Sequence, residues 1–417
     1  MSITGAIKRR LRPLKKKFDK RKKEKAKERK REMMKKIRAE EKVVDNRIAI
    51  MTNTFRYTCN PKYIYEEIKR QDPGYEVTWL VADSDAEGYP EDVHKVKYNS
   101  EEGLRAVYSS KVWLDNGIAF SNYFDKKEDQ LHLQTMHGSL GIKIIDNAVK
   151  SRNERNDHGR LVVKRETENT NYVITNSEFE ESVFRRVFWK DTPMVRLGHA
   201  RTDILFSKDE ELISGIRREL NRRYGIPEDK KILMYAPTHR RGLTAEDLYI
   251  DYPRFLKVLS EKFGGEFVVL LRLHDRTKDL KPAGLELDYV YEVSDYPDMQ
   301  ELMLVTDVGI TDYSSWIFDY VLMKRPGFMY ATDIDRYNNR TGLAYPLEES
   351  PFPVAYTPDE LIERAESFDQ ELFEKRVDEF LEGKGSVDEG HSAKDIVDWL
   401  QTIAPVSKQE KTPEGEE

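Results

Sequence analysis

The stretch MLVTDVGITDYSSWIFDY, residues 303 to 320, passes from an apolar run through a polar junction into a second apolar pattern. The run that ends at Ile310 predicts a buried strand, and the apolar residues from Trp316 onward recur with helical spacing. A strand that leads directly into a helix is the repeating unit of α/β proteins. The junction itself, residues 311 to 315, carries three aliphatic hydroxyl groups and a carboxylate.

Two interpretations of this junction are open from the residues alone. Asp312 or a serine could cap the helix by accepting hydrogen bonds from the N–H groups of its first turn. The same N–H groups, with the hydroxyls of Ser314 and Ser315 beside them, could instead bind an anion, most often a phosphate.

The alternation of strands and helices extends on both sides of this stretch. Before it, strands are predicted at residues 47–53, 76–83, 111–116, 131–136, 172–177 and 194–199, and helices at 61–71, 100–110 and 179–188. After a helix at 209–225, further strands are predicted at 230–238, 266–274, 307–312 and 327–333. This pattern predicts parallel sheets wound with helices on both faces.

Polar residues between 204 and 228 divide the chain into two such domains. We expect a basic arm over residues 1–44, a first domain over 45–205, a second domain over 206–404 and a disordered tail over 405–417. Two doubly wound domains in one chain commonly face one another across a cleft. Ligands in such sheets bind at the carboxyl ends of the strands.

The composition argues against a membrane span and against a disulfide. No stretch approaches the ~18 uninterrupted apolar residues that a spanning helix needs, and no apolar segment of a secretory signal follows the N-terminal charges. The single cysteine, Cys59, excludes an internal disulfide and a cysteine-based zinc site and fits a reducing cytoplasm. We expect Cys59 to be a packed residue rather than a nucleophile.

The arm carries a strong positive charge. Residues 1–42 contain 20 Lys or Arg against 6 Asp or Glu, whereas the rest of the chain contains 50 against 70. Apolar residues recur every three or four positions within it, at Ile3, Ile7, Leu11, Leu14 and Phe18. A narrow apolar stripe amid dense positive charge is typical of a helix on an anionic membrane surface. A solvated arm is the plainer alternative, and no nucleic acid is expected because binding it needs no apolar stripe.

Polar side chains gather directly after the predicted strands. The segments are HGSLGIK (137–143), GHARTD (198–203), APTHRR (236–241), RLHDR (272–276), TDYSS (311–315) and, further on, YNNRTG (337–342). Four of the eight histidines lie in these segments. Each group alone could be a satisfied histidine, a surface charge or a tight turn. Together, cationic and hydroxyl groups that converge on one cleft suit a di- or polyanionic ligand.

Other classes of site have less support. Asp312, Asp319 and Asp333 are too scattered to predict a hard-metal site. Neither the GxxxxGK[ST] pattern of nucleotide hydrolysis nor the GxSxG pattern of hydrolases occurs. The sequence therefore predicts no metal and no cofactor.

Six ordered motifs resemble the CDP-glycerol glycerophosphotransferase family, which contains teichoic acid primases and polymerases and related capsule enzymes. They are QTMHGSLGIK, GHARTD, YAPTHR, LRLH, ITDYSSWIFDY and YATDIDRYNNRTGLAY, within residues 45 to 400. The resemblance implies a GT-B fold, with two Rossmann-like domains around a cleft, on a protein attached peripherally to the cytoplasmic membrane face. It also implies transfer of a polyol phosphate from CDP-glycerol or CDP-ribitol to a lipid-linked or glycan acceptor, with release of CMP.

The resemblance also implies roles for individual residues. His137 would be the general base for the acceptor hydroxyl, and His274 with Arg272 would bind the donor phosphate. Ser314 and Ser315 would hold the pyrophosphate at the helix N-terminus. The other residues implied in donor binding are Thr238, Arg240, Asp312 and Arg340. The loop and turn residues of the matching motifs are Gly138, Ser139, Gly198, Arg201 and Asp203.

Several motifs depart from the family pattern. Ser139 and Leu140 replace the Thr-Pro that usually follows His-Gly, Leu273 replaces the Pro of Arg-Pro-His, and His239 replaces a Trp. These changes near the cleft leave the polyol and the acceptor open. Two other interpretations also stay open, a GT-B glycosyltransferase that uses a nucleotide sugar and a non-catalytic binding protein with a basic arm.

Overall fold

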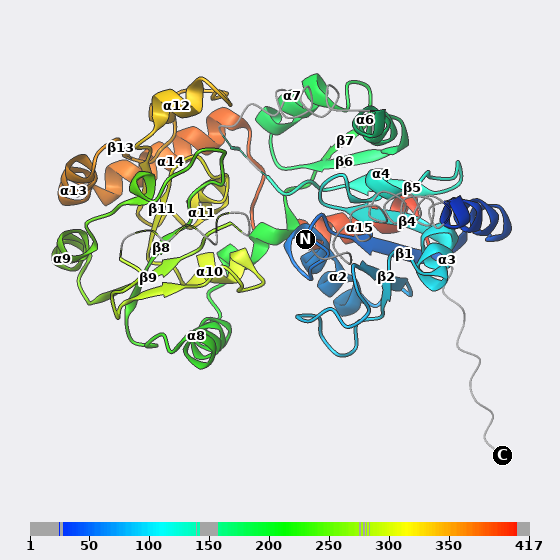
Figure 1. Ribbon diagram of the computed structural model, residues 1–417, viewed down its shortest axis with the longest axis horizontal. Coiled ribbons are helices and arrows are strands. Elements are labelled where there is room, and N and C mark those ends of the chain that lie inside the picture. The colour runs from blue at the N-terminus through cyan, green and yellow to red at the C-terminus, as the bar shows by residue number, and fades with distance from the viewer. Residues whose placement is uncertain are drawn as a thin grey trace, which may run out of the picture.

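The computed structural model describes residues 25, 28–138, 140–141, 157–274, 277, 280, 282 and 284–406. Two α/β domains lie side by side in Figure 1, each built on its own sheet. Most of the predicted arm, including its whole apolar stripe, and residues 407–417 of the predicted tail lie outside the described residues.

The first domain is built on a sheet with the order β3-β2-β1-β4-β5-β6-β7, in which every strand pair is parallel. Its strands are β1 (Val44–Met51), β2 (Glu76–Val81), β3 (Lys95–Lys97), β4 (Ser110–Asp115), β5 (Leu131–Gln134), β6 (Tyr172–Thr175) and β7 (Met194–Arg196). Its helices are α2 (Cys59–Gln71), α3 (Glu101–Ser109), α4 (Ala119–Tyr123), α6 (Asp157–Asn169) and α7 (Glu178–Val187). The strand order reverses between β1 and β4, and in open sheets ligands bind at such switch points.

Helices cover both faces of this sheet, as alternate residues of β1 show. Ile48 and Ile50 belong to an apolar core that includes residues of α2, whereas Ala49 and Met51 belong to a second core that includes residues of α3 and α4. Successive side chains of a strand point to opposite faces, so a strand buried on both faces has a continuous apolar sequence. The predicted double winding is confirmed for this domain.

The second domain has the parallel strand order β10-β9-β8-β11-β12-β13, with its reversal between β8 and β11. Its strands are β8 (Lys231–Tyr235), β9 (Phe267–Leu271), β10 (Val290–Glu292), β11 (Val308–Thr311), β12 (Gly327–Tyr330) and β13 (Val354–Ala355). Its helices are α8 (Glu210–Tyr224), α9 (Tyr252–Phe263), α10 (Met299–Val305), α11 (Ile317–Tyr320), α12 (Ile334–Asn338), α13 (Pro358–Glu366) and α14 (Gln370–Lys384). Short 3-10 turns are η2 (Glu246–Leu248), η3 (Val321–Met323) and η4 (Leu347–Glu349), and η1 (Ala200–Phe206) joins the domains.

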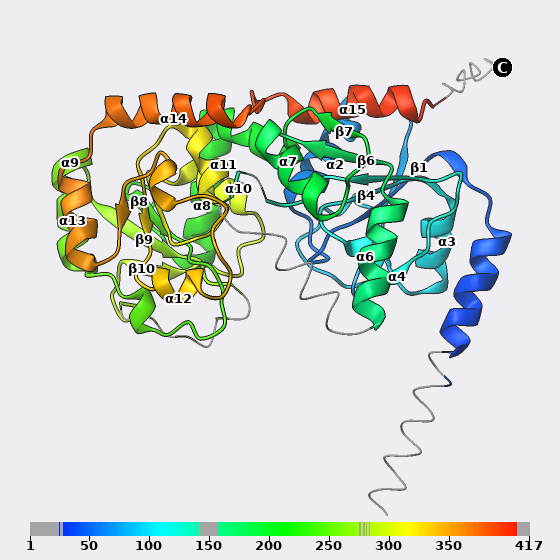
Figure 2. The ribbon, with the colours of Figure 1, turned by 90° about the horizontal axis from the view of Figure 1, so that it is seen from above.

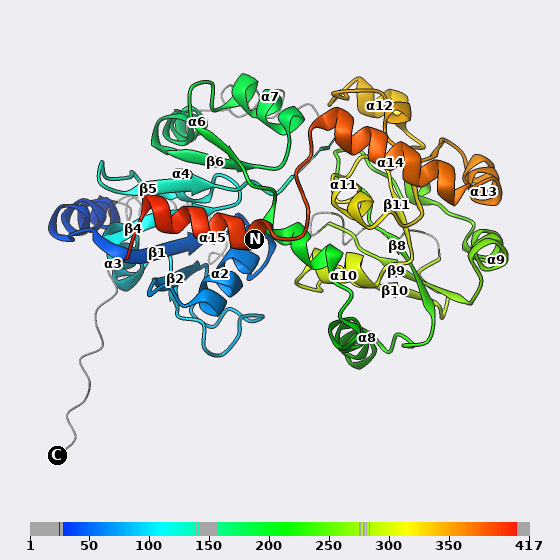
Figure 3. The same cartoon turned by 180° about the vertical axis from the view of Figure 1, so that it is seen from behind.

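The last helix returns to the first domain. α14 lies along the second domain and α15 (Ser392–Ile403) continues beyond it along the first, as Figures 2 and 3 show. Ile396, Val397 and Leu400 of α15 are buried in the core shared with α2. This packing differs from the predicted second domain, which extended to residue 404. The apolar spacing of a helix predicts that it buries one face, but not against which sheet.

The end of the basic arm packs on the first domain. Residues 28–40 are helical, and Ile37 is buried in the core that includes α3 and α4. Nε and Nη2 of Arg38 donate to the backbone carbonyls of Asp125 and Lys126, at 3.1 and 3.0 Å. The last turns of this helix therefore have a fixed position, with exposed basic side chains before them.

Ion pairs of Lys62 and an inserted loop join the two domains. Nζ of Lys62, on α2, lies 2.6 Å from Oδ2 of Asp298 and 2.8 Å from Oε1 of Glu301 in the second domain. Leu140, from the loop after β5, is buried in the core of the second domain. None of the helices among the described residues is long and apolar enough to cross a membrane.

Candidate active site

His137 lies at the switch point of the first sheet. It follows β5, and its Nδ1 is 2.6 Å from the carbonyl oxygen of Asn116, which follows β4. A carbonyl oxygen can only accept, so Nδ1 carries the proton, and in the neutral ring Nε2 has the lone pair. The side-chain amide of Asn53, after β1, lies 3.4 Å from the same Nδ1. Nδ2 of Asn53 is itself a donor and does not bond to this protonated Nδ1, so the loop after β4 orients the ring through the carbonyl of Asn116 and leaves the lone pair on Nε2.

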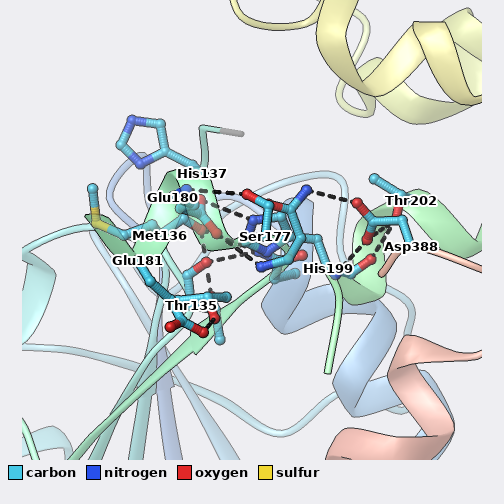
Figure 4. Close-up of polar contacts among 12 residues, drawn as sticks. Thr135, Met136, His137, Ser177, Glu180, Glu181, His199, Thr202 and Asp388 are labelled. Carbon is cyan, nitrogen blue, oxygen red and sulfur yellow. Dashed lines mark hydrogen bonds and ion pairs between the residues drawn. The ribbon is translucent and has the colours of Figure 1, made fainter. Parts of the chain in front are cut away.

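A buried polar cluster lies behind this loop, and the ring of His137 points away from it in Figure 4. Nε2 of His199 is 3.1 Å from Oε1 of Glu180, whose other oxygen accepts from N–H of Asn176 at 2.9 Å. Burial raises the pKa of Glu180 to about 8 against the opposing effects of that hydrogen bond and of Arg201, and burial lowers the pKa of His199 to about 3. His199 is neutral at physiological pH and is a structural group.

The GHARTD segment connects the domains rather than lining the space at His137. Nε and Nη2 of Arg201 lie 2.7 and 3.0 Å from the carboxylate oxygens of Asp319 on α11, and both side chains are buried. The carboxylate of Asp203 accepts from the N–H groups of Ser392 and Ala393 and so caps α15. Gly198 has a φ of +83°, and a Cβ there would lie 2.1 Å from Oγ of Ser392.

Asp312, in the polar junction of residues 311–315, binds the loop that follows β8. Its Oδ1 accepts from the N–H groups of Tyr313 and Thr238, at 2.5 and 2.7 Å, and its Oδ2 forms an ion pair with Arg240. Thr238 and Arg240 follow β8, so the carboxylate joins the loops on either side of the second switch point. The helix that follows is only four residues long and has no side-chain cap. The expected support from a helix N-terminus is therefore small, since a macrodipole needs several aligned turns.

Arg240 is held by two carboxylates. Its Nε and Nη2 lie 2.8 and 2.6 Å from Asp333, which also accepts from the hydroxyl of Tyr313 at 3.0 Å. Burial acts to raise the pKa of Asp333, but hydrogen bonds from Arg240 and Arg336 outweigh it and lower that pKa. The charge of Arg240 is thus compensated inside the protein. Arg240 thus braces the loop, and its expected role in binding the donor stays a prediction.

A cavity of about 310 Å³ opens beside this brace. Its lining is rich in cations: Thr238, His239, Arg240, Arg241, Asp333, Arg336, Tyr337, Arg340 and Thr341. Arg340 donates from Nη1 to the main-chain carbonyl of Arg241, and both residues are exposed and line the cavity. Oγ1 of Thr238 is buried without a hydrogen-bond partner among the described residues. An anionic ligand would match this lining in charge.

His274 and Arg272 follow β9, next to β8 in the sheet. The rings of His239 and His274 are stacked with their centroids 5.1 Å apart, and Nη1 of Arg272 donates to the carbonyl of Tyr296 at 2.8 Å. His274 is exposed. The structure thus brings His274 to the cavity through its neighbour His239, a residue whose role the sequence did not assign.

The two halves of the site meet at Gly138 and Ser315. A Cβ added to Gly138 would lie 3.9 Å from Oγ of Ser315, although the two residues belong to different domains. Leu140, two residues further on, is buried in the second domain, and its carbonyl accepts from the hydroxyl of Tyr345. The loop that carries His137 therefore reaches across to the turn that carries Ser314 and Ser315. Ser139 lies outside the described residues.

Some contributors to the site had no recognisable signal in the sequence. Asn116 orients the ring of His137 through its main-chain carbonyl, and Asn60 joins the loops after β5 and β7 with its side chain. Within the part of the chain that the structure describes, no three His, Cys, Asp or Glu residues gather in a group that could hold a metal ion. The predictions of no metal and no cofactor stay predictions.

Comparison with known proteins gives a consistent result. The family profile described as CDP-Glycerol:Poly(glycerophosphate) glycerophosphotransferase matches residues 33–402. Teichoic acid poly(glycerol phosphate) polymerases of Staphylococcus epidermidis and Bacillus subtilis are 33% and 32% identical over 82% and 75% of this chain. The alignments cover 48% and 42% of those proteins, so the chain spans about half the length of these relatives.

Two further matches extend over most of both chains. A teichoic acid glycerol-phosphate transferase of Staphylococcus aureus is 29% identical, over 84% of this chain and 90% of its own. The structure of the wall teichoic acid polymerase TagF superposes with a TM-score of 0.77 at 30% identity, covering 93% of this chain and 97% of the other. The fold is the predicted GT-B arrangement of two Rossmann-like domains.

Proposed function

The chain belongs to the CDP-glycerol:poly(glycerophosphate) glycerophosphotransferase family, and from this premise we propose that it transfers a polyol phosphate from a CDP-activated donor to a hydroxyl group of its acceptor. The donor is CDP-glycerol or CDP-ribitol, and the acceptor is a lipid-linked or glycan molecule of teichoic acid or capsule-type synthesis. Relatives in the same range of similarity are named as glycerol-phosphate and as ribitol-phosphate enzymes, so the polyol is for experiment to decide.

The reaction begins with a proton transfer to His137. Its Nε2 takes the proton of the acceptor hydroxyl, while the hydroxyl oxygen attacks the phosphorus that carries the polyol. The bond from that phosphorus to the oxygen bridging it to the cytidylyl phosphate breaks, and CMP leaves with the bonding electron pair. Phosphoryl transfer depends mainly on positioning and on charge stabilisation, and a histidine with a fixed tautomer suits the base.

Cations of the second domain compensate the charge of the donor. Arg340 and Arg241 at the rim of the cavity, with His274 beside His239, face the pyrophosphate in this proposal. Ser314 and Ser315 contribute hydroxyl donors. Arg240 and Asp312 act indirectly in this proposal, because Arg240 forms ion pairs with both Asp312 and Asp333.

The observation that carries the proposal is the proximity of Gly138 to Ser315. It brings the base of one domain to the hydroxyl-rich turn of the other, and transfer requires an acceptor hydroxyl and a donor phosphorus at one place. A variant of TagF soaked with CDPG is among the structures that superpose on this chain. That match supports a CDP-linked donor over a nucleotide sugar.

The basic arm supplies attachment to the cytoplasmic face of the membrane in this proposal. Residues 28–40 form a helix whose last turns pack on the first domain, and the basic side chains of its earlier turns are exposed. Anionic headgroups attract such a segment, and the acceptor of a lipid-linked synthesis is presented at that surface. The protein is then a peripheral one.

The test is CMP release by the purified full chain. CDP-glycerol and CDP-ribitol are supplied in parallel with a membrane extract as acceptor, and wild type is compared with His137→Ala. His94→Ala is the matched control, because His94 is exposed and precedes β3 at the opposite edge of the same sheet. We expect release with one donor, lost in His137→Ala and kept in His94→Ala.

Two results would overturn the proposal. One is no release with either donor across several acceptors, which would direct the search to nucleotide sugars. The other is release that His137→Ala leaves unchanged while circular dichroism shows the variant folded.

A further inference from the structure

The backbone just before His137 has an unfavourable conformation that its neighbours impose. Met136 has a φ of +49°, in the left-handed region that costs an L-residue roughly 1 kcal/mol or more. Its N–H donates to Oε1 of Gln134 at 2.9 Å, and its carbonyl accepts from Nδ2 of Asn60 at 3.1 Å. Both polar groups of the strained residue are therefore held by buried amide side chains.

Gln134 is itself held by two buried acids. Its Nε2 lies 2.8 Å from Oδ1 of Asp115 and 2.9 Å from Oε1 of Glu166, and it also donates to the carbonyl of Gly117. Ser121 donates to the other oxygen of Glu166 at 2.6 Å. The amide of Gln134 is thus oriented so that its oxygen faces the N–H of the loop.

Asp115 fixes the other partner of His137. Its carboxylate accepts from N–H of Gly117 at 2.7 Å and from N–H of Phe120 at 3.1 Å. These bonds set the turn after β4, and the carbonyl of Asn116 within that turn accepts from the ring of His137. The main chain and the ring of His137 are therefore both positioned through Gln134 and Asp115.

The composition of this cluster is costly for a group that only stabilises the fold. Asp115, His132, Gln134 and Glu166 are all fully buried, and burial raises the pKa of Glu166 to about 7. Apolar residues of similar size commonly stabilise a core as well as buried acids or better. Buried charged clusters next to a site are a recurrent mark of function.

From these contacts we infer that Gln134 and Asp115 are positioning residues, which act on the reaction only by setting the orientation and the tautomer of the His137 ring. The inference rests on the proposed function for its kinetic part. Its structural part concerns the ring alone and is measurable without turnover.

The chain offers a matched pair of variants for the test. Gln130 precedes β5 as Gln134 ends it, is equally buried, and donates to the carbonyls of Val107 and Ser110 at 2.8 and 2.7 Å. Gln134→Met and Gln130→Met each replace a side-chain amide by an apolar group of similar shape, at opposite ends of β5. Both are expected to lower Tm, whereas only Gln134→Met is expected to lower kcat for CMP release, by roughly 10- to 100-fold.

Two readouts separate positioning from general destabilisation. On a His137→Ala background, Gln134→Met should cause no further loss of residual activity, because its effect passes through the missing ring. In 15N-histidine NMR spectra of the full chain, the wild-type His137 ring should show one protonated and one unprotonated nitrogen of a fixed tautomer. In Gln134→Met the two nitrogen shifts should move towards their average.

Equal losses of kcat in the two methionine variants, or an unchanged His137 spectrum in Gln134→Met, would overturn the inference. Asp115→Asn takes the place of Gln134→Met if the latter does not fold, with the same expected results. If the wild type releases no CMP, the proposed function fails, and the NMR comparison still decides whether these residues set the ring.

Discussion

The hydroxyl of Tyr345, in the second domain, donates a hydrogen bond to the carbonyl of Leu140, in the loop of the first domain that carries His137. The side chain of Leu140 is buried in the core of the second domain beside it. One short loop thus carries His137, the proposed base, in one domain while being packed into the other. The proposed chemistry depends on the two domains holding this loop together.

Leu140→Ala should loosen this connection. A buried Leu→Ala change typically costs about 2 to 5 kcal/mol, and here we expect the loss to fall on the loop rather than on the whole fold. We therefore expect a large fall in kcat for CMP release with only a small fall in Tm. Tyr345→Phe keeps the ring and removes one hydrogen bond, about 1 kcal/mol, and should give a smaller fall in kcat. A drop in Tm with unchanged kcat in both variants would contradict this account.

Breaking the buried pair of Arg201 and Asp319 should destabilise the whole chain. Asp319→Asn leaves a buried guanidinium without its counter-charge, and removing one partner of such a pair typically costs about 3 to 5 kcal/mol. Urea denaturation measures the free energy of unfolding. Glu379→Gln, which removes the partner of Lys375 in an exposed pair at 3.8 Å, is the control and should leave the midpoint nearly unchanged.

Glu180 should make the stability depend on pH between about 6.5 and 8. Its folded pKa is about 8, above the ordinary value of 4.5. The folded state therefore keeps a proton that the unfolded state releases, and stability falls as pH rises towards 8. His199, with a folded pKa of about 3, changes proton binding only below its unfolded pKa of about 6.5, where it acts in the opposite direction.

The variant Glu180→Gln isolates this effect. Over pH 6.5 to 8 the free energy of unfolding of the wild type should fall relative to that of the variant, by at most about 2 kcal/mol for one proton. Urea titrations at several pH values give both curves. Parallel curves over this window would show that Glu180 does not bind the extra proton.

Arg340 should contribute to donor affinity. It is exposed at the rim of the cavity, next to Arg241, and its removal takes one cation from a pyrophosphate site. Arg340→Ala is expected to raise KM for the CDP donor by roughly tenfold, as the loss of one charge-assisted hydrogen bond of about 1.5 kcal/mol implies. Arg376→Ala, at a separate cavity of the second domain, should leave KM unchanged.

The basic helix should govern vesicle binding. Each Lys or Arg near an anionic surface contributes about 1 kcal/mol, so neutralising five should weaken binding by roughly a thousandfold or more. The variant replaces by Gln the exposed residues Arg29, Lys30, Arg31, Lys35 and Lys36. Sedimentation with phosphatidylserine vesicles measures the affinity, and Lys257→Gln with Lys375→Gln on the second domain is the control. Equal binding by both variants would remove the helix from the proposal.

The sequence by itself determined the two doubly wound domains and the segments that build the site. The apolar run in residues 266–274 and the helical spacing of residues 209–225 are local patterns, and β9 and α8 formed where they predicted. The strand-end rule placed His137, Thr238, His274 and Asp312 at the carboxyl edges of the sheets. That rule needs only the order of elements along the chain.

Only the tertiary structure decided what these residues do for one another. Arg240 is braced by Asp333, 93 residues away, and Arg201 is paired with Asp319, 118 residues away. The return of α15 to the first domain, and the insertion of Leu140 into the second, depend on which apolar faces meet. A single chain shows the type of each side chain, but contact energies depend on distance and burial, and these exist only once the sheets have packed.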